Sequence, residues 1–287
     1  MKRTCRLILA CASLFVAVPV LQSTGNNNTI ILSGIPGPYA FHRFCRLGSE
    51  WWSVGGDGSI HAYSPHCTVE EQRPTETALN AVCFLESGSG WIAGESGVIM
   101  HTTDWGNHWI LQKSGVTRDL NSVACTDDLH CWISGNKGTL LVTGDGGLNW
   151  SCVRLGVTND LLAIYFLDNV VGWAVGRDGI VAKSTDGGHT WSIDYLRKEL
   201  FPGNPSEGPT HWSAVRFSSS THGWLAGPRW VASTEDGATW KCKHIDCFDG
   251  IGVVSQDGQI VWAVDDGACN NYWSRDGGRT WAKCQRP

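Results

Sequence analysis

The chain has 287 residues and a net charge of −5, and it contains no basic run that would mark a nucleic-acid interface, so we expect no nucleic-acid partner. Glycine (35) and tryptophan (16) are abundant, methionine (2) is scarce, and charged residues make up only 17%. This composition is typical of a compact β protein with many tight turns, and the hydrophobic share of 42% excludes a disordered chain.

The first 25 residues have the composition of a targeting segment. Lysine and arginine within the first six positions precede an apolar stretch, Leu7–Leu21, and then four small or polar residues. This order predicts a signal peptide at 1–25 and therefore an exported protein, which is secreted, periplasmic or lumenal. The alternative is a retained anchor, although the stretch is short for a membrane span. After cleavage we expect no integral membrane span.

Six related segments follow at nearly regular spacing. Their leading tryptophans lie 39, 41, 41, 51 and 38 residues apart, at Trp52, Trp91, Trp132, Trp173, Trp224 and Trp262. A period of about 40 to 50 residues is typical of the four-stranded blade of a β-propeller. The spacing of 51 contains the longest link, 198–210, whose proline and glycine residues indicate a loop.

Each segment divides into four short strands separated by turns. In the second, Leu79–Leu85 alternates in polarity, Trp91–Gly94 and Val98–Thr102 follow after glycine-containing turns, and a fourth strand ends near Lys113. We therefore predict an all-β fold, a β-propeller of six four-stranded blades, or seven if one blade is degenerate. It forms a single domain at 26–287, which we expect to be monomeric. The expected blades are 39–72, 78–115, 119–155, 160–197, 211–246 and 250–285.

A closing hairpin with the pattern Ser/Thr-x-Asp-x-Gly-x-Thr-Trp recurs in five of the segments. Its acidic position is occupied by Asp104, Asp145, Asp186, Glu235 and Asp276. An aspartate in a tight turn accepts hydrogen bonds from nearby backbone N–H groups, and the tryptophan packs into the blade. We interpret these acids as structural turn formers, because they belong to the repeat.

The hairpins resemble the Asp-box or BNR repeats of sialidases, sortilins and related propellers. The longer phrase, seen from Gly172 to Trp191, resembles the photosystem II stability and assembly factor family and many exported bacterial propellers. The resemblance covers about residues 39–283 and implies a protein-binding propeller. The chain departs from the photosystem family in its six evident blades, where that family has seven, and in its mild acidity.

Ten of the 12 cysteines lie outside the predicted signal, an even number that is expected of an exported chain with disulfides. Local spacing suggests that three pairs form within hairpins or short loops: Cys125 with Cys131, Cys242 with Cys247, and Cys269 with Cys284. Four others have no evident partner: Cys45, Cys67, Cys83 and Cys152. Metal-binding spacings and cofactor fingerprints are absent, so we expect no metal and no cofactor.

We expect a non-catalytic binding scaffold or assembly factor, with a protein or a glycan as partner and no catalytic residues. The turns opposite the box turns vary from blade to blade, as specific recognition requires. They place these candidate binding residues on one face: Asp57, Glu95, Lys137, Arg177, Asp178, Arg229 and Trp230. The alternatives are a glycoside hydrolase of sialidase or BNR type, using Arg43, Arg46 and Arg216 in the channel, and a lectin without turnover.

Overall fold

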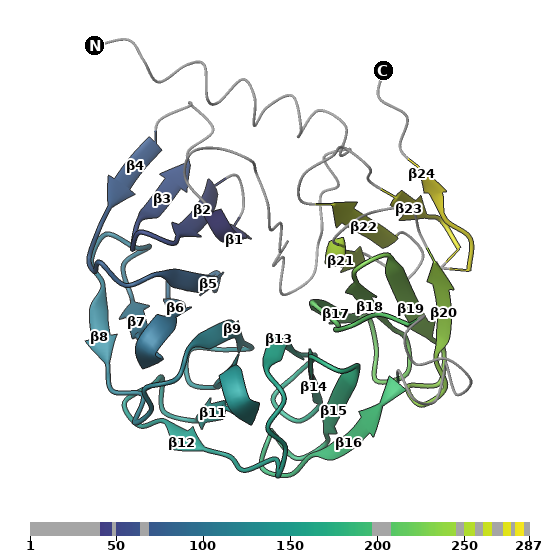
Figure 1. Ribbon diagram of the computed structural model, residues 1–287. Coiled ribbons are helices and arrows are strands. Elements are labelled where there is room, and N and C mark those ends of the chain that lie inside the picture. The colour runs from purple at the N-terminus through teal and green to yellow at the C-terminus, as the bar shows by residue number, and fades with distance from the viewer. Residues whose placement is uncertain are drawn as a thin grey trace.

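The structure, a computed structural model, describes residues 41–47, 50–63, 69–196, 208–244, 250–255, 261–265, 272–276 and 279–283. These residues form an all-β fold of six four-stranded antiparallel sheets arranged around a common axis (Figure 1). The predicted all-β propeller is therefore confirmed. The predicted signal peptide at 1–25 lies outside the described residues. Among the described residues, no helix has the length and apolar character needed to span a membrane.

Each sheet is one blade, and its strands follow in chain order. Blades 1 to 3 contain β1 (Phe41–Leu47), β2 (Glu50–Gly55), β3 (Ile60–Tyr63) and β4 (Val69–Gln72); β5 (Leu79–Phe84), β6 (Gly90–Gly94), β7 (Ile99–Thr102) and β8 (Ile110–Gln112); and β9 (Leu120–Cys125), β10 (Cys131–Gly135), β11 (Leu140–Thr143) and β12 (Ser151–Cys152). Blades 4 to 6 contain β13 (Leu161–Phe166), β14 (Gly172–Gly176), β15 (Ile180–Ser184) and β16 (Ser192–Tyr195); β17 (Ala214–Phe217), β18 (Gly223–Gly227), β19 (Trp230–Thr234) and β20 (Lys241–His244); and β21 (Gly250–Ser255), β22 (Val261–Asp265), β23 (Tyr272–Ser274) and β24 (Ala282–Lys283). Two short 3-10 turns, η1 (Glu95–Gly97) and η2 (Asn136–Gly138), join β6 to β7 and β10 to β11.

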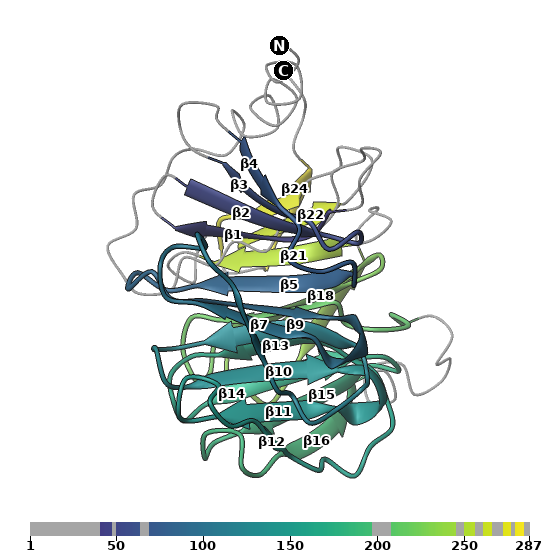
Figure 2. The same cartoon turned by 90° about the vertical axis from the view of Figure 1, so that its left-hand side faces the viewer.

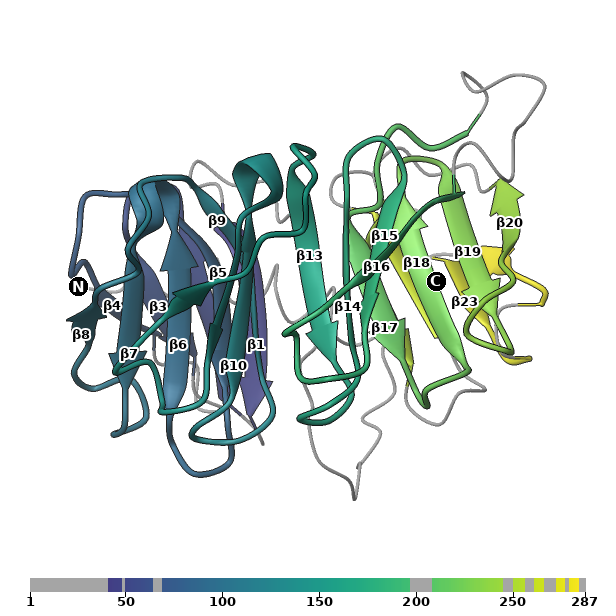
Figure 3. The same cartoon turned by 90° about the horizontal axis from the view of Figure 1, so that it is seen from below.

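The first strand of every blade lies nearest the axis, and contacts link each of these strands to the next from β1 to β21. Figures 2 and 3 show the blades stacked face against face, with their turns gathered at the two ends of the strands. Turns between the first and second strands lie with the box turns on one face, which we call the box face. Backbone bonds such as Gly146 N to Leu129 O (3.0 Å) and Gly187 N to Val170 O (2.8 Å) join the two kinds of turn. Turns between the second and third strands lie on the opposite, non-box face.

The core lies between the blades, because each sheet packs its two faces on its neighbours. The leading tryptophans whose side chains are described are almost completely buried: Trp52, Trp91, Trp132, Trp173 and Trp224. Three of them pack on a phenylalanine that ends the first strand of the next blade. Trp173 and Phe217 are nearly parallel with ring centroids 3.5 Å apart, and Phe217 meets the box residue Trp240 edge-on at 5.9 Å. The same three-ring stack recurs at Trp132, Phe166 and Trp191. Burial of large aromatic rings in these geometries is a major source of stability.

The central phenylalanine of each stack requires a glycine opposite it on the second strand. Phe166 pairs with Gly172, and a Cβ atom on Gly172 would come within 2.5 Å of the Phe166 ring. Blade 3 has no phenylalanine and glycine at these two positions. Cys125 and Cys131 stand there instead and form a disulfide between β9 and β10. Their Cα atoms lie 4.2 Å apart, as expected for a pair at which the two strands exchange no backbone hydrogen bond.

The disulfide Cys125–Cys131 confirms one of the three predicted pairs. The pairing of Cys242 with Cys247 is not seen, because Cys242 is a free thiol, and Cys247 lies outside the described residues. Burial of Cys242 raises its pKa to about 12, so its thiol is neutral at physiological pH. Cys269 and Cys284 also lie outside the described residues, so their pairing stays a prediction.

Candidate functional site

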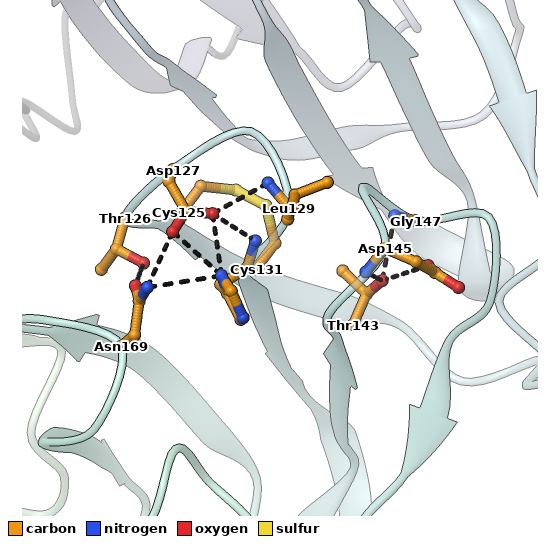
Figure 4. Close-up of polar contacts among 10 residues, drawn as sticks. Cys125, Thr126, Asp127, Leu129, Cys131, Thr143, Asp145, Gly147 and Asn169 are labelled. Carbon is orange, nitrogen blue, oxygen red and sulfur yellow. Dashed lines mark hydrogen bonds and ion pairs between the residues drawn. A yellow bond between two sulfur atoms is a disulfide. The ribbon is translucent and has the colours of Figure 1, made fainter.

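The box turns are built around one carboxylate each. In blade 4, Asp186 Oδ1 accepts hydrogen bonds from the Ser184 hydroxyl (2.9 Å) and the Thr190 N–H (2.9 Å), and Oδ2 accepts from the Thr190 hydroxyl (2.5 Å). The Ser184 oxygen in turn accepts the N–H of Gly188 at 2.8 Å. The same arrangement holds Asp104, Asp145 and Asp276, and Figure 4 shows it at Thr143, Asp145 and Gly147. These carboxylates bind their own turns.

Blade 5 differs from the expectation at Glu235. The structure gives the turn-forming role to Asp236, whose Oδ1 accepts from the Thr234 hydroxyl (3.0 Å) and the N–H groups of Ala238 (2.9 Å) and Thr239 (2.7 Å). Glu235 instead forms an ion pair with Arg279 of the blade 6 box at 2.9 Å. The turn of blade 5 is shorter by one residue than the other box turns. Counting back from Trp240 by the usual spacing therefore led to Glu235 instead of Asp236.

Acid is expected to destabilise the protein through these turns. Hydrogen bonds to the carboxylates, led by those from the side chains of His108, Thr190 and Thr280, hold the pKa values of Asp104, Asp186 and Asp276 at about 2. An unfolded aspartate titrates near pH 4, so this stabilisation is present above about pH 4 and is lost as the pH falls through 2. Melting temperatures from pH 5 to pH 2 should fall more steeply for the wild type than for Asp186→Asn/Asp276→Asn. Equal slopes would contradict this origin of acid sensitivity.

A polar network on the box face surrounds the disulfide turn of blade 3 (Figure 4). Asp127 accepts hydrogen bonds from the N–H groups of Leu129 and His130, both at 2.8 Å, and from the Asn169 amide of blade 4 at 2.7 Å. Burial would raise the pKa of Asp127, but these bonds outweigh it and hold the pKa at about 2. Ser87 of blade 2 binds Asp128 at 2.5 Å, so this turn joins three consecutive blades.

The non-box turns are tied to the following blade through the backbone. The N–H of Ser96 donates to Asp119 Oδ1, and the N–H of Lys137 donates to Asp160 Oδ1, both at 3.0 Å. Both donors have the left-handed conformation, with φ of 54° and 55°. The N–H of Asp178, with φ of 58°, donates to the Thr210 carbonyl at 2.9 Å. Each of these turns is thus held by hydrogen bonds to residues that lead into the next blade. These bonds offset the energetic cost of the left-handed backbone conformation.

The predicted binding residues lie in these turns or, for Trp230, directly after one, on the non-box face, and several of them stabilise the fold. Arg177 pairs with Asp160 at 3.1 Å, and Asp178 accepts from the Asn159 amide at 2.8 Å. Asp57 pairs with Arg73 at 2.7 Å, and the Ser59 hydroxyl is the main cause of its lowered pKa. Glu95 begins η1, and its N–H donates to the Ala78 carbonyl.

Arg229 and Trp230 occupy the corresponding turn of blade 5. Arg229 has φ of 60°, and Trp230 begins β19. The Trp230 ring is half-buried: it packs on the hydrophobic core between blades 4 and 5 and contacts His244 edge-on at 5.1 Å. It therefore offers less free surface than an exposed anchor would. The non-box face stays a prediction for the binding site.

Among the described side chains, the first strands bring the half-buried Arg216 to the axis. The Arg216 guanidinium lies 4.9 Å from the centroid of the Tyr165 ring, and its buried Nη2 has no hydrogen-bond partner among the residues that the structure describes. Burial lowers the pKa of Arg216, and the ionisable groups that act on it are Tyr165, Cys83 and Cys45. None of the six first strands, as bounded above, contains aspartate or glutamate. Arg43 and Arg46 lie in β1, but their side chains are outside the described set.

A cavity of about 550 Å³ lies on the box side of blade 5, where this blade meets the box turn of blade 6. Its lining includes Glu235, Asp236, Lys241, Lys243 and Arg279. Sequence reasoning missed it, because the two lysines fall in a fourth strand that carries no motif. The alternation Lys-Cys-Lys-His could have indicated two cations on one side of a strand. In the described part of the chain, no group of His, Cys, Asp and Glu side chains has a metal-binding arrangement.

A family model described as photosynthesis system II assembly factor YCF48 matches residues 111–210, less than half of the chain. Immune protein Tsi7 of Pseudomonas aeruginosa is 33% identical over 79 residues, which cover 27% of this chain and 25% of that protein. The chain therefore spans about a quarter of the length of this curated relative.

Three solved structures share the fold. A structure described as YCF48 bound to D1 peptide has a TM-score of 0.65 and 16% identity, covering 93% of this chain and 86% of that one. YCF48 from Cyanidioschyzon merolae has a TM-score of 0.63 and 18% identity, and the match covers 89% of this chain and 88% of that one. The fold is that of a YCF48-like propeller. A GH74 enzyme from Niastella koreensis has a TM-score of 0.64 and 16% identity, and the match covers 91% of this chain but only 46% of the enzyme.

Proposed function

We propose that this YCF48-like propeller is a non-catalytic, exported scaffold or assembly factor that binds a segment of another protein. The observation that carries the proposal is the similarity over 93% of the chain to a propeller structure that holds a peptide. A propeller of this fold can therefore bind a peptide. The proposal is consistent with the blade-to-blade bonds described above, which present the turns on a rigid frame, as binding scaffolds require.

The second candidate is a glycoside hydrolase, because a GH74 enzyme shares the fold. That chemistry ordinarily uses two carboxyl groups on either side of the scissile bond. The first strands contain no acidic residue, and the box carboxylates are occupied by their own turns. These two observations favour binding over catalysis.

Parallel binding and turnover assays test the proposal. The purified chain should bind members of a peptide array made from envelope proteins of its source, and it should leave a panel of fluorogenic glycosides and oligosaccharides unchanged. Binding to a glycan array without peptide binding would favour the lectin alternative. Turnover that is lost on substitution of a single carboxylate would establish the hydrolase instead.

The non-box face is tested with Arg229→Ala/Trp230→Ala. If the peptide partner uses this face, the double variant should weaken binding by more than about 2 kcal/mol, because arginine and tryptophan are frequent hot-spot residues. Its melting temperature must be measured alongside, since Trp230 also packs on the core. Unchanged affinity would place the partner elsewhere on the ring.

A further inference from the structure

We propose that the cavity between blades 5 and 6 binds an extended acidic segment of the protein partner, whose carboxylates at alternate positions engage Lys241 and Lys243. This inference rests on the proposed peptide-binding function and names where, and by what chemistry, the partner is held. Lys241 and Lys243 both line the cavity and lie on β20, two residues apart. Side chains at this spacing point to the same side of a strand.

In blades 1 and 2, the residue at the equivalent position closes the junction with the next blade. Gln112 of blade 2 donates to the Gly146 carbonyl of the next box turn at 2.9 Å and accepts from Trp150 Nε1 at 3.1 Å. Gln72 of blade 1 likewise donates to Gly106 O at 2.8 Å. Strand register makes Lys243 the counterpart of Gln112, because Lys243 pairs with Val231 as Gln112 pairs with Ile99. A lysine carries donors only, so it cannot accept an indole N–H as glutamine does.

The charges around the cavity leave the two lysines available. Asp236 is occupied by its turn, and Glu235 is paired with Arg279, which is the main cause of its lowered pKa. The charge of Lys241 contributes less to that lowering than Arg279 does. Within the described residues, neither lysine ammonium forms an ion pair. Both lysines are exposed on a chain of net charge −5. A local cation pair on an acidic protein attracts an acidic partner and sets its orientation.

Spacing and size determine the form of the ligand. The two ammonium groups stem from Cα atoms about 7 Å apart, which is the repeat between alternate residues of an extended peptide. An extended segment with acidic residues at positions i and i+2 therefore matches them one to one. The volume of about 550 Å³ is in the range of sites that accept a few side chains.

Fluorescence polarisation with two labelled peptides tests this match on the full chain. The probes are acetyl-Ser-Gly-Asp-Val-Asp-Val-Gly-amide and the same peptide with asparagine at both aspartate positions. At low ionic strength, the aspartate probe should bind about tenfold more tightly than the asparagine probe, and added salt should reduce the difference. Lys241→Gln/Lys243→Gln should bring the affinity for the aspartate probe down to that of the asparagine probe. Lys241→Arg/Lys243→Arg should preserve it.

The matched control is Lys113→Gln/Arg154→Gln, which removes two exposed cationic side chains that lie outside the cavity and outside the predicted binding set of the non-box face. It should change the affinity by no more than about twofold. Equal loss in the control variant, or full binding by Lys241→Gln/Lys243→Gln, would overturn the cavity assignment. If neither probe binds while other array peptides do, the cavity assignment fails and the proposed function stands. If no peptide binds at all, both fail.

Discussion

Trp173→Ala is expected to lower the free energy of unfolding by about 3–5 kcal/mol, the usual cost of truncating a buried aromatic ring. Trp173 is 1% exposed and stacks on Phe217 with its ring centroid 3.5 Å away. Its loss would empty the interface between blades 4 and 5 and leave Phe217 without its parallel partner. Urea unfolding followed by circular dichroism would measure the change.

Leu148→Ala provides the comparison for Trp173→Ala. Leu148 is 83% exposed in the box turn of blade 3, so its truncation should change stability by no more than about 0.5 kcal/mol. A similar loss in both variants would mean that the inter-blade stack is not a principal source of stability.

Removal of the blade 3 disulfide, by Cys125→Ala/Cys131→Ala, is expected to cost about 2 kcal/mol from loop closure alone. A further loss should follow from the space left beside the core between blades 2 and 3, because both cysteines belong to it. Thermal melts of oxidised wild type, reduced wild type and the variant would separate the two contributions. The reduced wild type should fall between the other two.

A rescue variant tests why the disulfide is there. Cys125→Phe/Cys131→Gly rebuilds the pair that blades 2, 4 and 5 use, as in Phe217 opposite Gly223. It should recover much of the stability lost by the alanine variant and should no longer respond to reductant. If it is less stable than the alanine variant, the disulfide does not simply replace the phenylalanine and glycine pair.

Much of the fold could be predicted because the features of the repeat depend on interactions between residues that are close in sequence. Each repeat contains a leading tryptophan, glycine-containing turns and a hairpin in which a hydroxyl binds a carboxylate. Each of these features determines the conformation of only the few residues around it, so the strands and the box turns could be predicted from the sequence. Even the disulfide had a local signal, since Cys125 and Cys131 are six residues apart, like Phe84 and Gly90. The misassigned Glu235 also had one, because Thr234, Asp236 and Thr239 reproduce the turn with one residue fewer.

The candidate site was harder to predict, because it depends on contacts between blades. The sequence places Lys137 in a variable turn, but it does not show that its N–H is held by Asp160 of the next blade. Nor does it show that Gln112 closes one junction while Lys243, its counterpart, lines an open one. Such pairs are set by the curvature of the ring, which no single blade determines.

The attachment of blade 4 to blade 5 makes this junction a natural place to graft foreign sequence. On one side Leu196 is buried and its N–H donates to Gly179 O at 3.1 Å; on the other, Thr210 O receives the N–H of Asp178 at 2.9 Å. Both ends of the intervening link are thus fixed by bonds that do not involve residues 197–207. The sequence carries its longest link between blades here, so we expect that an exchanged loop, tag or recognition peptide can be displayed between these anchors while the six blades keep their register.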